Sequence, residues 1–201
     1  MQKFFIFGMF RSGTTFLSKI LNNEKKIICA SDCIFPVFKM IRNQIINNRN
    51  KVEPFNHYIF DKKQMLNFEK IQRANLSKIL VKTKYEEINF LVNDYAKNFH
   101  PALLDRLKLK KNFFNFKEII DYYFFKLKKI KPKVNVVGFK EVWLNEFIPI
   151  LNKYDKKMKF ILLIRDPRSI VSSNFANKNN SYPIFFLICQ WLKIANLTIY
   201  Y

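Results

Sequence analysis

Residues 3–15 read KFFIFGMFRSGTT, and this stretch decides the fold. Lys3–Phe7 is a short, continuous apolar run, which is typical of a strand buried on both faces of a parallel sheet. A loop between two glycines follows, and Thr14–Asn22 then carries apolar residues at helical spacing. Lys26–Ala30 (KIICA) is a second apolar run. The order strand, glycine loop, helix and strand predicts a βαβ unit.

Similar apolar runs return late in the chain. Asn135–Phe139 (NVVGF) and Lys159–Ile164 (KFILLI) predict two further strands, with a helix from about Val142 to Lys153 between them. Earlier in the chain, Phe35–Asn48 predicts a helix. Asn50 to Lys131 is mostly helical in pattern, with breaks near Pro54 and at His100-Pro101.

The sequence therefore predicts an α/β fold, in which helices flank a parallel β-sheet and a helical insertion separates the early strands from the late ones. We expect one domain over residues 1–201. Ligands of such sheets bind at the carboxyl ends of the strands. The loops after Phe7, Ala30, Phe139 and Ile164 should therefore share one crevice.

Composition restricts the function less than the motifs do. Apolar residues make up 49% of the chain and aromatic residues 17%, which argues against a disordered chain. The net charge of +21 can mark a partner rich in phosphate or sulfate, or an anionic membrane surface. However, lysine is spread along the whole chain and Asn, Ile and Phe are also frequent, which is the composition that an AT-rich genome produces.

Three cysteines make no disulfide framework, and the Cys29–Cys33 pair lacks the second pair of ligands that a zinc site needs. We therefore expect a reducing, cytoplasmic location and no metal. We expect no signal peptide, because the first apolar run is short, ends at Arg11 and lacks a small-residue cleavage site. The final stretch, residues 182–201, contains Gln190, Lys193 and Asn196. It predicts an amphipathic helix that needs a covering partner rather than a membrane span.

The glycine loop predicts an anion site. Gly8 and Gly13 have the spacing of the P-loop pattern G-x-x-x-x-G-K-[ST], but Thr14 stands where that pattern has the lysine that reaches the β- and γ-phosphates. Backbone N–H groups at a helix N-terminus still suit an anion. Ser12, Thr14 and Thr15 add hydroxyl groups, and Arg11 adds a forked cation. Such a loop suits a nucleotide with one phosphate beside a second anionic group.

Residues 5–17, FIFGMFRSGTTFL, resemble the 5′-phosphosulfate loop of sulfotransferases that use 3′-phosphoadenosine 5′-phosphosulfate (PAPS). The resemblance implies that this loop wraps the 5′-phosphosulfate and that Arg11 contacts the bridging and sulfuryl oxygens. Residues 159–175, KFILLIRDPRSIVSSNF, resemble the 3′-phosphate motif of the same family, in which an arginine ends a strand and a serine follows eight residues later. Here these residues are Arg165 and Ser173.

The alternatives are an ion pair of Arg165 with Asp166 or another surface acid, and a solvated Ser173 on its helix. In the family, further chain follows the second motif and closes over the adenosine, so we expect this chain to lack the family's C-terminal part. The resemblance implies a hydroxyl or amine acceptor, of the carbohydrate, glycolipid, tyrosyl peptide or small alcohol class, and PAPS as the donor.

A general base should take the proton of the acceptor. Asp32 follows the second strand, where several sulfotransferases carry an acidic base, and its alternative role is to cap the next helix. Glu141 follows the third strand and is the next candidate, while His57 and His100 lie in the variable helical region. Lys140 could supply a second cation to the sulfuryl group.

Two other classes of function stay open from sequence alone. A P-loop nucleotide kinase is one, although Thr14 replaces its lysine. A non-catalytic basic fragment that binds nucleic acid or a membrane surface is the other. We expect no nucleic-acid partner, because the sequence has no nucleic-acid-binding motif and its basic residues are not clustered.

Overall fold

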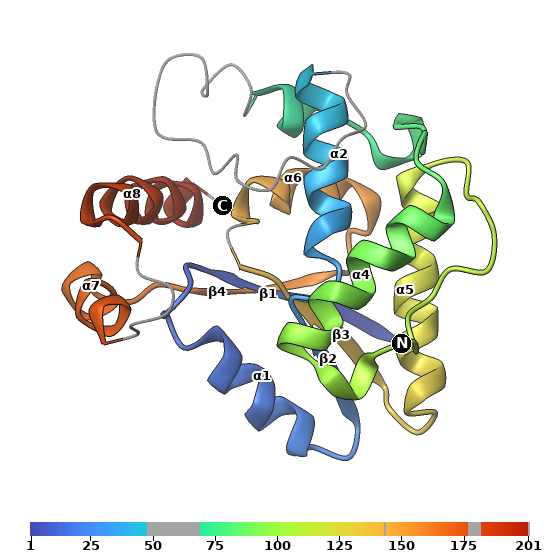
Figure 1. The fold of residues 1–201 in the computed structure, drawn as a ribbon, viewed down its shortest axis with the longest axis horizontal. Helices are drawn as coiled ribbons and strands as arrows, with labels where there is room; N and C mark the ends of the chain where they lie inside the picture. Colours follow the sequence, from blue (N-terminus) through green and yellow to red (C-terminus); the bar gives the residue numbers. More distant parts are fainter. Residues whose placement is uncertain (48–68, 143, 177–181, 201) are drawn as a thin grey trace.

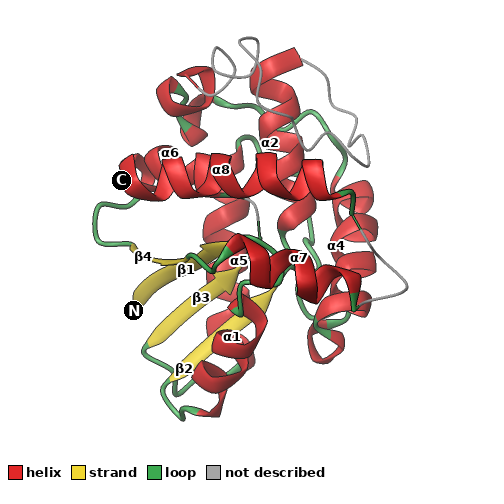
Figure 2. Cartoon of the chain, turned by 90° about the vertical axis from the view of Figure 1, so that its left-hand side faces the viewer, coloured by secondary structure: helices red, strands yellow, loops and turns green. Residues whose placement is uncertain are grey.

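The computed structural model describes residues 1–47, 69–142, 144–176 and 182–200. Within them, four parallel strands form one sheet in the order β2-β3-β1-β4. The strands are β1 Gln2–Gly8, β2 Ile27–Ser31, β3 Val136–Lys140 and β4 Lys159–Leu163. Each predicted strand is present with its bounds shifted by at most one residue. The predicted α/β fold with a parallel, helix-flanked sheet is therefore confirmed (Figure 2).

The helices that surround this sheet include one or more from every predicted helical region. They are α1 Thr14–Asn23, α2 Phe35–Asn47, α4 Tyr85–Phe99, α5 Phe116–Ile130, α6 Ile148–Tyr154, α7 Pro167–Phe175 and α8 Ile184–Tyr200, with short 3-10 turns η1 Leu76–Lys78, η2 Pro101–Leu103 and η3 Asn145–Phe147. The predicted break at His100-Pro101 separates α4 from η2. The break expected at Pro54 lies outside the described residues.

The expected helix from Val142 to Lys153 differs from the structure in where it begins. A 3-10 turn, η3, comes first, and the α-helix α6 begins only at Ile148. Pro149 explains this start, because proline has no N–H to donate and its fixed φ suits the first turn of a helix.

Alternate residues of the strands face two layers of helices. Phe5 and Phe7 of β1 belong to the larger core, which α2, α4, α5 and α6 cover, whereas Phe4 and Ile6 face α1. Figure 1 shows α1 on one side of the strands and α2 and α6 on the other. This alternation is what a strand of period two between two helical layers requires.

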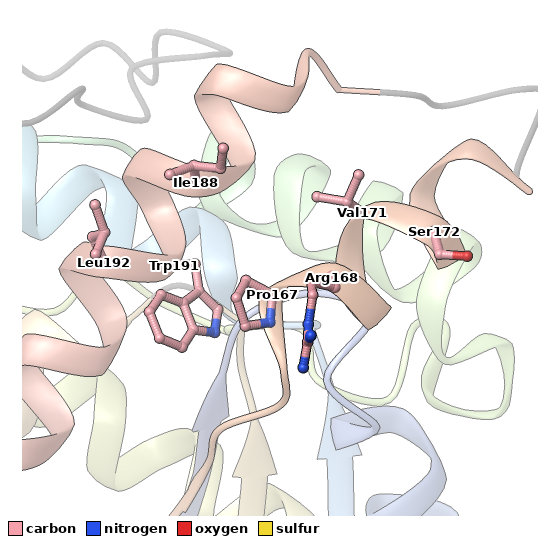
Figure 3. Close-up of a pocket in the computed structure, with 7 residues that line it drawn as sticks. All are labelled: Pro167, Arg168, Val171, Ser172, Ile188, Trp191 and Leu192. Carbon is pink, nitrogen blue, oxygen red and sulfur yellow. The ribbon is translucent and has the colours of Figure 1, made fainter.

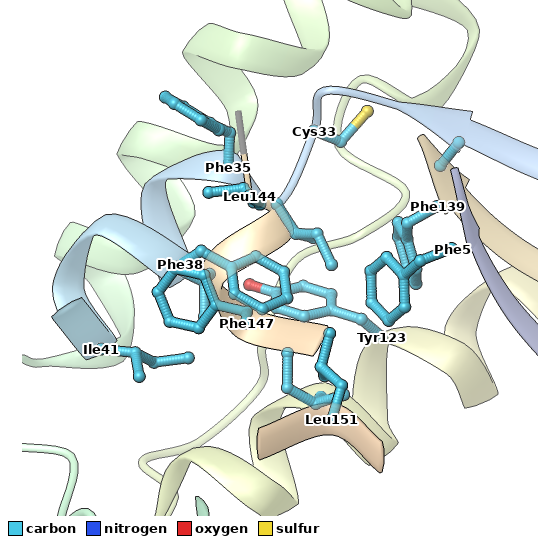
Figure 4. Close-up of a cluster of buried hydrophobic side chains, with 14 of the residues drawn as sticks. Phe5, Cys33, Phe35, Phe38, Ile41, Tyr123, Phe139, Leu144, Phe147 and Leu151 are labelled. Carbon is cyan, nitrogen blue, oxygen red and sulfur yellow. The ribbon is translucent and has the colours of Figure 1, made fainter. Parts of the chain in front are cut away.

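Aromatic rings fill the larger core. Phe5 packs edge-on against Phe38 of α2, whose ring in turn contacts Phe147, while Phe139 of β3 stacks beside Phe5 (Figure 4). All four rings are fully buried. Such pairs contribute about 0.5–1.5 kcal/mol each beyond the area that they bury, so this cluster fixes α2 and η3 against the carboxyl half of the sheet.

The last helix, α8, is the helix that the sequence predicts, but its apolar residues lie on two faces. Leu187, Ile194 and Leu197 are buried, whereas Phe185 and Ile199 are exposed at 68% and 80%. Along the described part of the chain, no helix has both the length and the apolar character needed to cross a membrane.

Because all four strands are parallel, their carboxyl ends lie at one edge of the sheet. Gly8 pairs in register with Leu163, and Ser31 pairs with Lys140. This edge brings the glycine loop, the Asp32 loop, the Glu141 loop and the Arg165 turn together, as expected for a binding crevice of an α/β sheet.

Candidate functional site

The glycine loop is a tight turn that depends on its two glycines. A Cβ added at Gly8 would lie 2.8 Å from the carbonyl oxygen of Leu163, so a side chain there would push the loop away from β4. Gly13 has a φ of 96° and stands at the N-cap of α1. Since L residues rarely adopt this backbone conformation, glycine is required at that position. Arg11 also has a positive φ, 63°.

The hydroxyl groups of the loop differ in what they contact. Ser12 donates its hydroxyl to the carbonyl oxygen of Met9, which is also the acceptor of the Ser12 backbone N–H, so this side chain braces the turn. Thr14 is buried, whereas Thr15 is exposed at the start of α1. Ser12 therefore braces the loop, Thr14 is enclosed beside it, and Thr15 is the exposed member of the three.

The loop has features that fit an anion. Among the described residues, no side chain caps the N-terminus of α1, and the buried Nε of Arg11 has no hydrogen-bond partner. A phosphate or sulfate group on the loop would offer acceptor oxygens to both the free helix N–H groups and the Arg11 guanidinium. The residues present therefore fit the phosphosulfate of PAPS.

Arg165 joins the second motif to the first. It follows β4, and its Nη1 donates to the carbonyl oxygen of Arg11 at 2.8 Å, across 154 positions of sequence. The alternative role of Arg165, an ion pair with Asp166, is absent from the described residues. Asp166 instead pairs with Arg168 at 2.6 Å and caps α7. The side chain of Arg165 is exposed, so the guanidinium keeps donors for a ligand. Ser173 lies half-buried in α7, and its role stays a prediction.

Asp32 and Lys140 form a buried ion pair. The Lys140 ammonium contacts Oδ2 of Asp32, while Oδ1 accepts the Val142 backbone N–H at 3.2 Å. The two side chains are 2% and 10% exposed. The carboxylate of Asp32 therefore ties the end of β2 to the end of β3, and an acceptor hydroxyl would share it with Lys140. Asp32 and Lys140 were both predicted from the sequence as site residues, but no pattern in the sequence predicts that they pair.

Glu141 is fully buried beside this pair. Its Oε1 accepts the Ile34 backbone N–H at 3.0 Å, and its Oε2 has no partner among the described residues. Burial first, and the negative charge of Asp32 second, raise the pKa of Glu141 well above its ordinary value. The raised pKa favours the protonated form of Glu141. Its hydrogen bond with the Ile34 backbone holds the start of α2 against the end of β3.

His100 lies at the same edge of the sheet, a position that no pattern in the sequence predicts. Its Nδ1 accepts the backbone N–H of Ser31, next to Asp32, at 3.1 Å. Burial lowers the pKa of His100, so the neutral ring is favoured. A ring nitrogen that already accepts a backbone N–H is a poor candidate for the base. His57 lies outside the described residues.

The fold and the loop define the class of the protein: an α/β protein with an anion-binding glycine loop between its first strand and first helix. The sequence profile of the sulfotransferase family matches residues 3–185. The chain belongs to the sulfotransferase family. A comparison with curated proteins gave no match. Within the described residues, no group of three or more His, Cys, Asp or Glu side chains could hold a metal ion.

Glu141→Gln should change how stability depends on pH. With its pKa raised, Glu141 keeps its proton in the folded protein at pH values where the unfolded chain has lost it, so the folded state loses stability as pH rises above about 4.5. Glutamine does not titrate. As the pH rises above about 4.5, the stability of the variant relative to wild type should therefore increase by up to about 1.4 kcal/mol per pH unit, for as long as Glu141 stays protonated in the folded protein. Urea unfolding of both proteins from about pH 5 to about pH 8 measures this difference.

Glu146→Gln is the matched control, because Glu146 is also a buried carboxyl but its pKa is lowered: the Lys193 and Arg42 charges outweigh its burial. Its difference from wild type should stay constant over the same pH range, since a lowered pKa changes stability only at lower pH. A constant difference for Glu141→Gln as well would contradict the raised pKa.

Proposed function

We propose that the chain transfers the sulfuryl group of PAPS to a hydroxyl or amine acceptor. The observation that carries this proposal is the hydrogen bond from the Arg165 guanidinium to the Arg11 carbonyl. It supports a single donor site because it brings the two motifs together: the glycine loop with Arg11 on one side, and the cation that follows β4 on the other. Family membership supports sulfuryl transfer as the reaction.

Each part of this site suits one part of the donor. The N-terminus of α1, Thr15 and Arg11 would bind the 5′-phosphosulfate, while Ser12, Gly13 and Thr14 hold the loop in shape. Arg165 and Ser173 would bind the 3′-phosphate. A bidentate guanidinium and a helix N-terminus are both preferred partners of phosphate.

The reaction forms a bond between the acceptor oxygen and sulfur, and breaks the bond between sulfur and the bridging oxygen of the donor. The leaving group is adenosine 3′,5′-bisphosphate, and the acceptor proton passes to a base. Charge that grows on the bridging oxygen would be stabilised by Arg11 and the loop N–H groups. Positioning of both substrates supplies much of the rate in such in-line transfers.

Asp32 is the base in this proposal. Three features support it over its rivals: it follows β2 at the edge where the loops meet, it is not wholly buried, and each of its oxygens has one partner and so a further lone pair. Lys140 would hold the carboxylate in place and add positive charge near the sulfuryl group. Glu141 is a weaker candidate, because it is completely buried and one of its oxygens braces α2.

Arg165→Ala should weaken binding of adenosine 3′,5′-bisphosphate by roughly 1.5–3 kcal/mol, which is the contribution of a hydrogen bond to a charged group. The loss should be much smaller for adenosine 5′-phosphosulfate, which has no 3′-phosphate. Titration calorimetry with both nucleotides measures the difference.

Arg168→Ala is the control for this experiment, because Arg168 is a neighbouring arginine whose exposed side chain pairs with Asp166. It should leave both affinities within about twofold of wild type, as most exposed pairs contribute little. An equal loss for both nucleotides in Arg165→Ala would mean that Arg165 supports the loop and does not bind the 3′-phosphate.

Asp32→Asn should lower turnover by about 10²-fold or more, while the affinity for adenosine 3′,5′-bisphosphate hardly changes. Asparagine keeps the shape and an oxygen for Lys140, but it takes up no proton. Turnover is measured with whichever acceptor the wild type sulfates in a panel of sugars, glycolipids, tyrosyl peptides and small alcohols. Near-normal turnover would remove Asp32 from this role, and Glu141→Gln in the same assay would then test the alternative.

A further inference from the structure

The last helix makes a direct hydrogen bond to the arginine of the second motif. Trp191 of α8 donates its indole N–H to the backbone carbonyl oxygen of Arg165 at 2.7 Å. The side chain of the same arginine donates to the Arg11 carbonyl at 2.8 Å. Arg165 is therefore held at two points, by α8 through its main chain and by the glycine loop through its guanidinium.

The helix that carries Trp191 is itself fixed to the body of the protein. Lys193 forms an ion pair with Glu146, which also pairs with Arg42 of α2 at 3.5 Å. Thr198 accepts a hydrogen bond from Asn145 at 3.1 Å. Because Glu146 is buried, these contacts hold α8 at a defined position over η3, so Trp191 is attached to a fixed support.

The surroundings of the indole ring are open. Trp191 is half-buried and, with Pro167, Arg168, Ile188 and Leu192, lines an apolar groove of about 550 Å³ between α7 and α8 (Figure 3). A ring that only filled the core would be enclosed on all sides. Here the polar edge of the ring turns toward the backbone of Arg165, and its apolar face borders the groove.

We propose that Trp191 is a positioning residue, which holds the backbone of Arg165 so that its guanidinium meets the 3′-phosphate of the donor. This inference rests on the proposed function. Arg165 has an exposed side chain and follows β4, which within the described residues pairs with β1 alone, so the strand ladder restrains this turn from one side. The hydrogen bond from α8 supplies the missing restraint, and it acts on the nucleotide only through Arg165.

Trp191→Phe tests this directly, because phenylalanine keeps an aromatic ring but has no N–H to donate. Loss of one neutral hydrogen bond corresponds to about a three- to tenfold weaker binding of adenosine 3′,5′-bisphosphate. Binding of adenosine 5′-phosphosulfate should stay within about twofold, since its contacts do not include Arg165. Leu192→Ala, which truncates an apolar groove residue of the same helix and removes no hydrogen bond, should leave both affinities unchanged.

A double-mutant cycle separates positioning from a general structural role. In an Arg165→Ala background, Trp191→Phe should have no further effect on bisphosphate binding, because the group through which it acts is gone. Additive losses, or an equal loss for both nucleotides, would overturn the proposal.

Two further outcomes are informative. If neither Trp191→Phe nor Trp191→Tyr folds, as judged by circular dichroism and thermal unfolding, the hydrogen bond serves the fold and the proposal is wrong. If the wild-type protein itself does not bind adenosine 3′,5′-bisphosphate, the proposed function is wrong. If the wild-type protein binds it and Trp191→Phe binds it equally well, the proposed function stands and the role of Trp191 is wrong.

Discussion

The hydrogen bond from Arg165 to the carbonyl oxygen of Arg11 joins the two motifs of the site, and the parallel pairing of β1 with β4 is the constraint on which it depends. It forms because β1 and β4 are parallel neighbours, with Gly8 opposite Leu163, so the turns that follow them lie side by side. The backbone of the glycine loop must bend sharply to present that carbonyl. Positive φ values at Arg11 and Gly13 provide the bend, and the missing side chain at Gly8 allows the close approach to β4.

A second set of contacts joins the other two strands at the same edge. Asp32 and Lys140 pair across the ends of β2 and β3, and Glu141 holds the start of α2. A buried ion pair is weak evidence for stability, because desolvation opposes it. These groups are better explained as fixing the geometry of the edge: they connect the loop that carries the proposed base to the strand next to β1.

The sequence was sufficient for the sheet and for the meeting of the loops that follow its strands. Continuous apolar runs mark buried parallel strands, and the glycine spacing marks the loop, so Arg11 and Arg165 could be named before any contact was known. The predicted strand bounds differ from the observed ones by up to one residue, because a strand ends where its hydrogen bonds to the neighbouring strand end, and hydropathy does not mark that point. The start of α6 was missed although Pro149 indicates it.

The contacts made by His100, Glu141 and Trp191 could not be predicted in this way. His100 meets Ser31 across 69 positions, and Glu141 meets Ile34 across 107. Trp191 meets Arg165 across 26, and the apolar pattern of α8 says only that a helix forms. Which polar atom of a side chain meets which backbone group depends on how whole helices pack, and no local pattern in the sequence encodes that.

The proposed donor site suits a nucleotide with 3′- and 5′-phosphates and not a nucleoside triphosphate. Titration calorimetry of the wild-type chain with adenosine 3′,5′-bisphosphate and with ATP tests this claim most directly. Because Thr14 stands where a kinase loop has its lysine, the γ-phosphate would lack its cation, while Arg165 would serve only the 3′-phosphate. The bisphosphate should therefore bind at least about tenfold tighter than ATP, which corresponds to about 1.4 kcal/mol. Equal or tighter binding of ATP would contradict it.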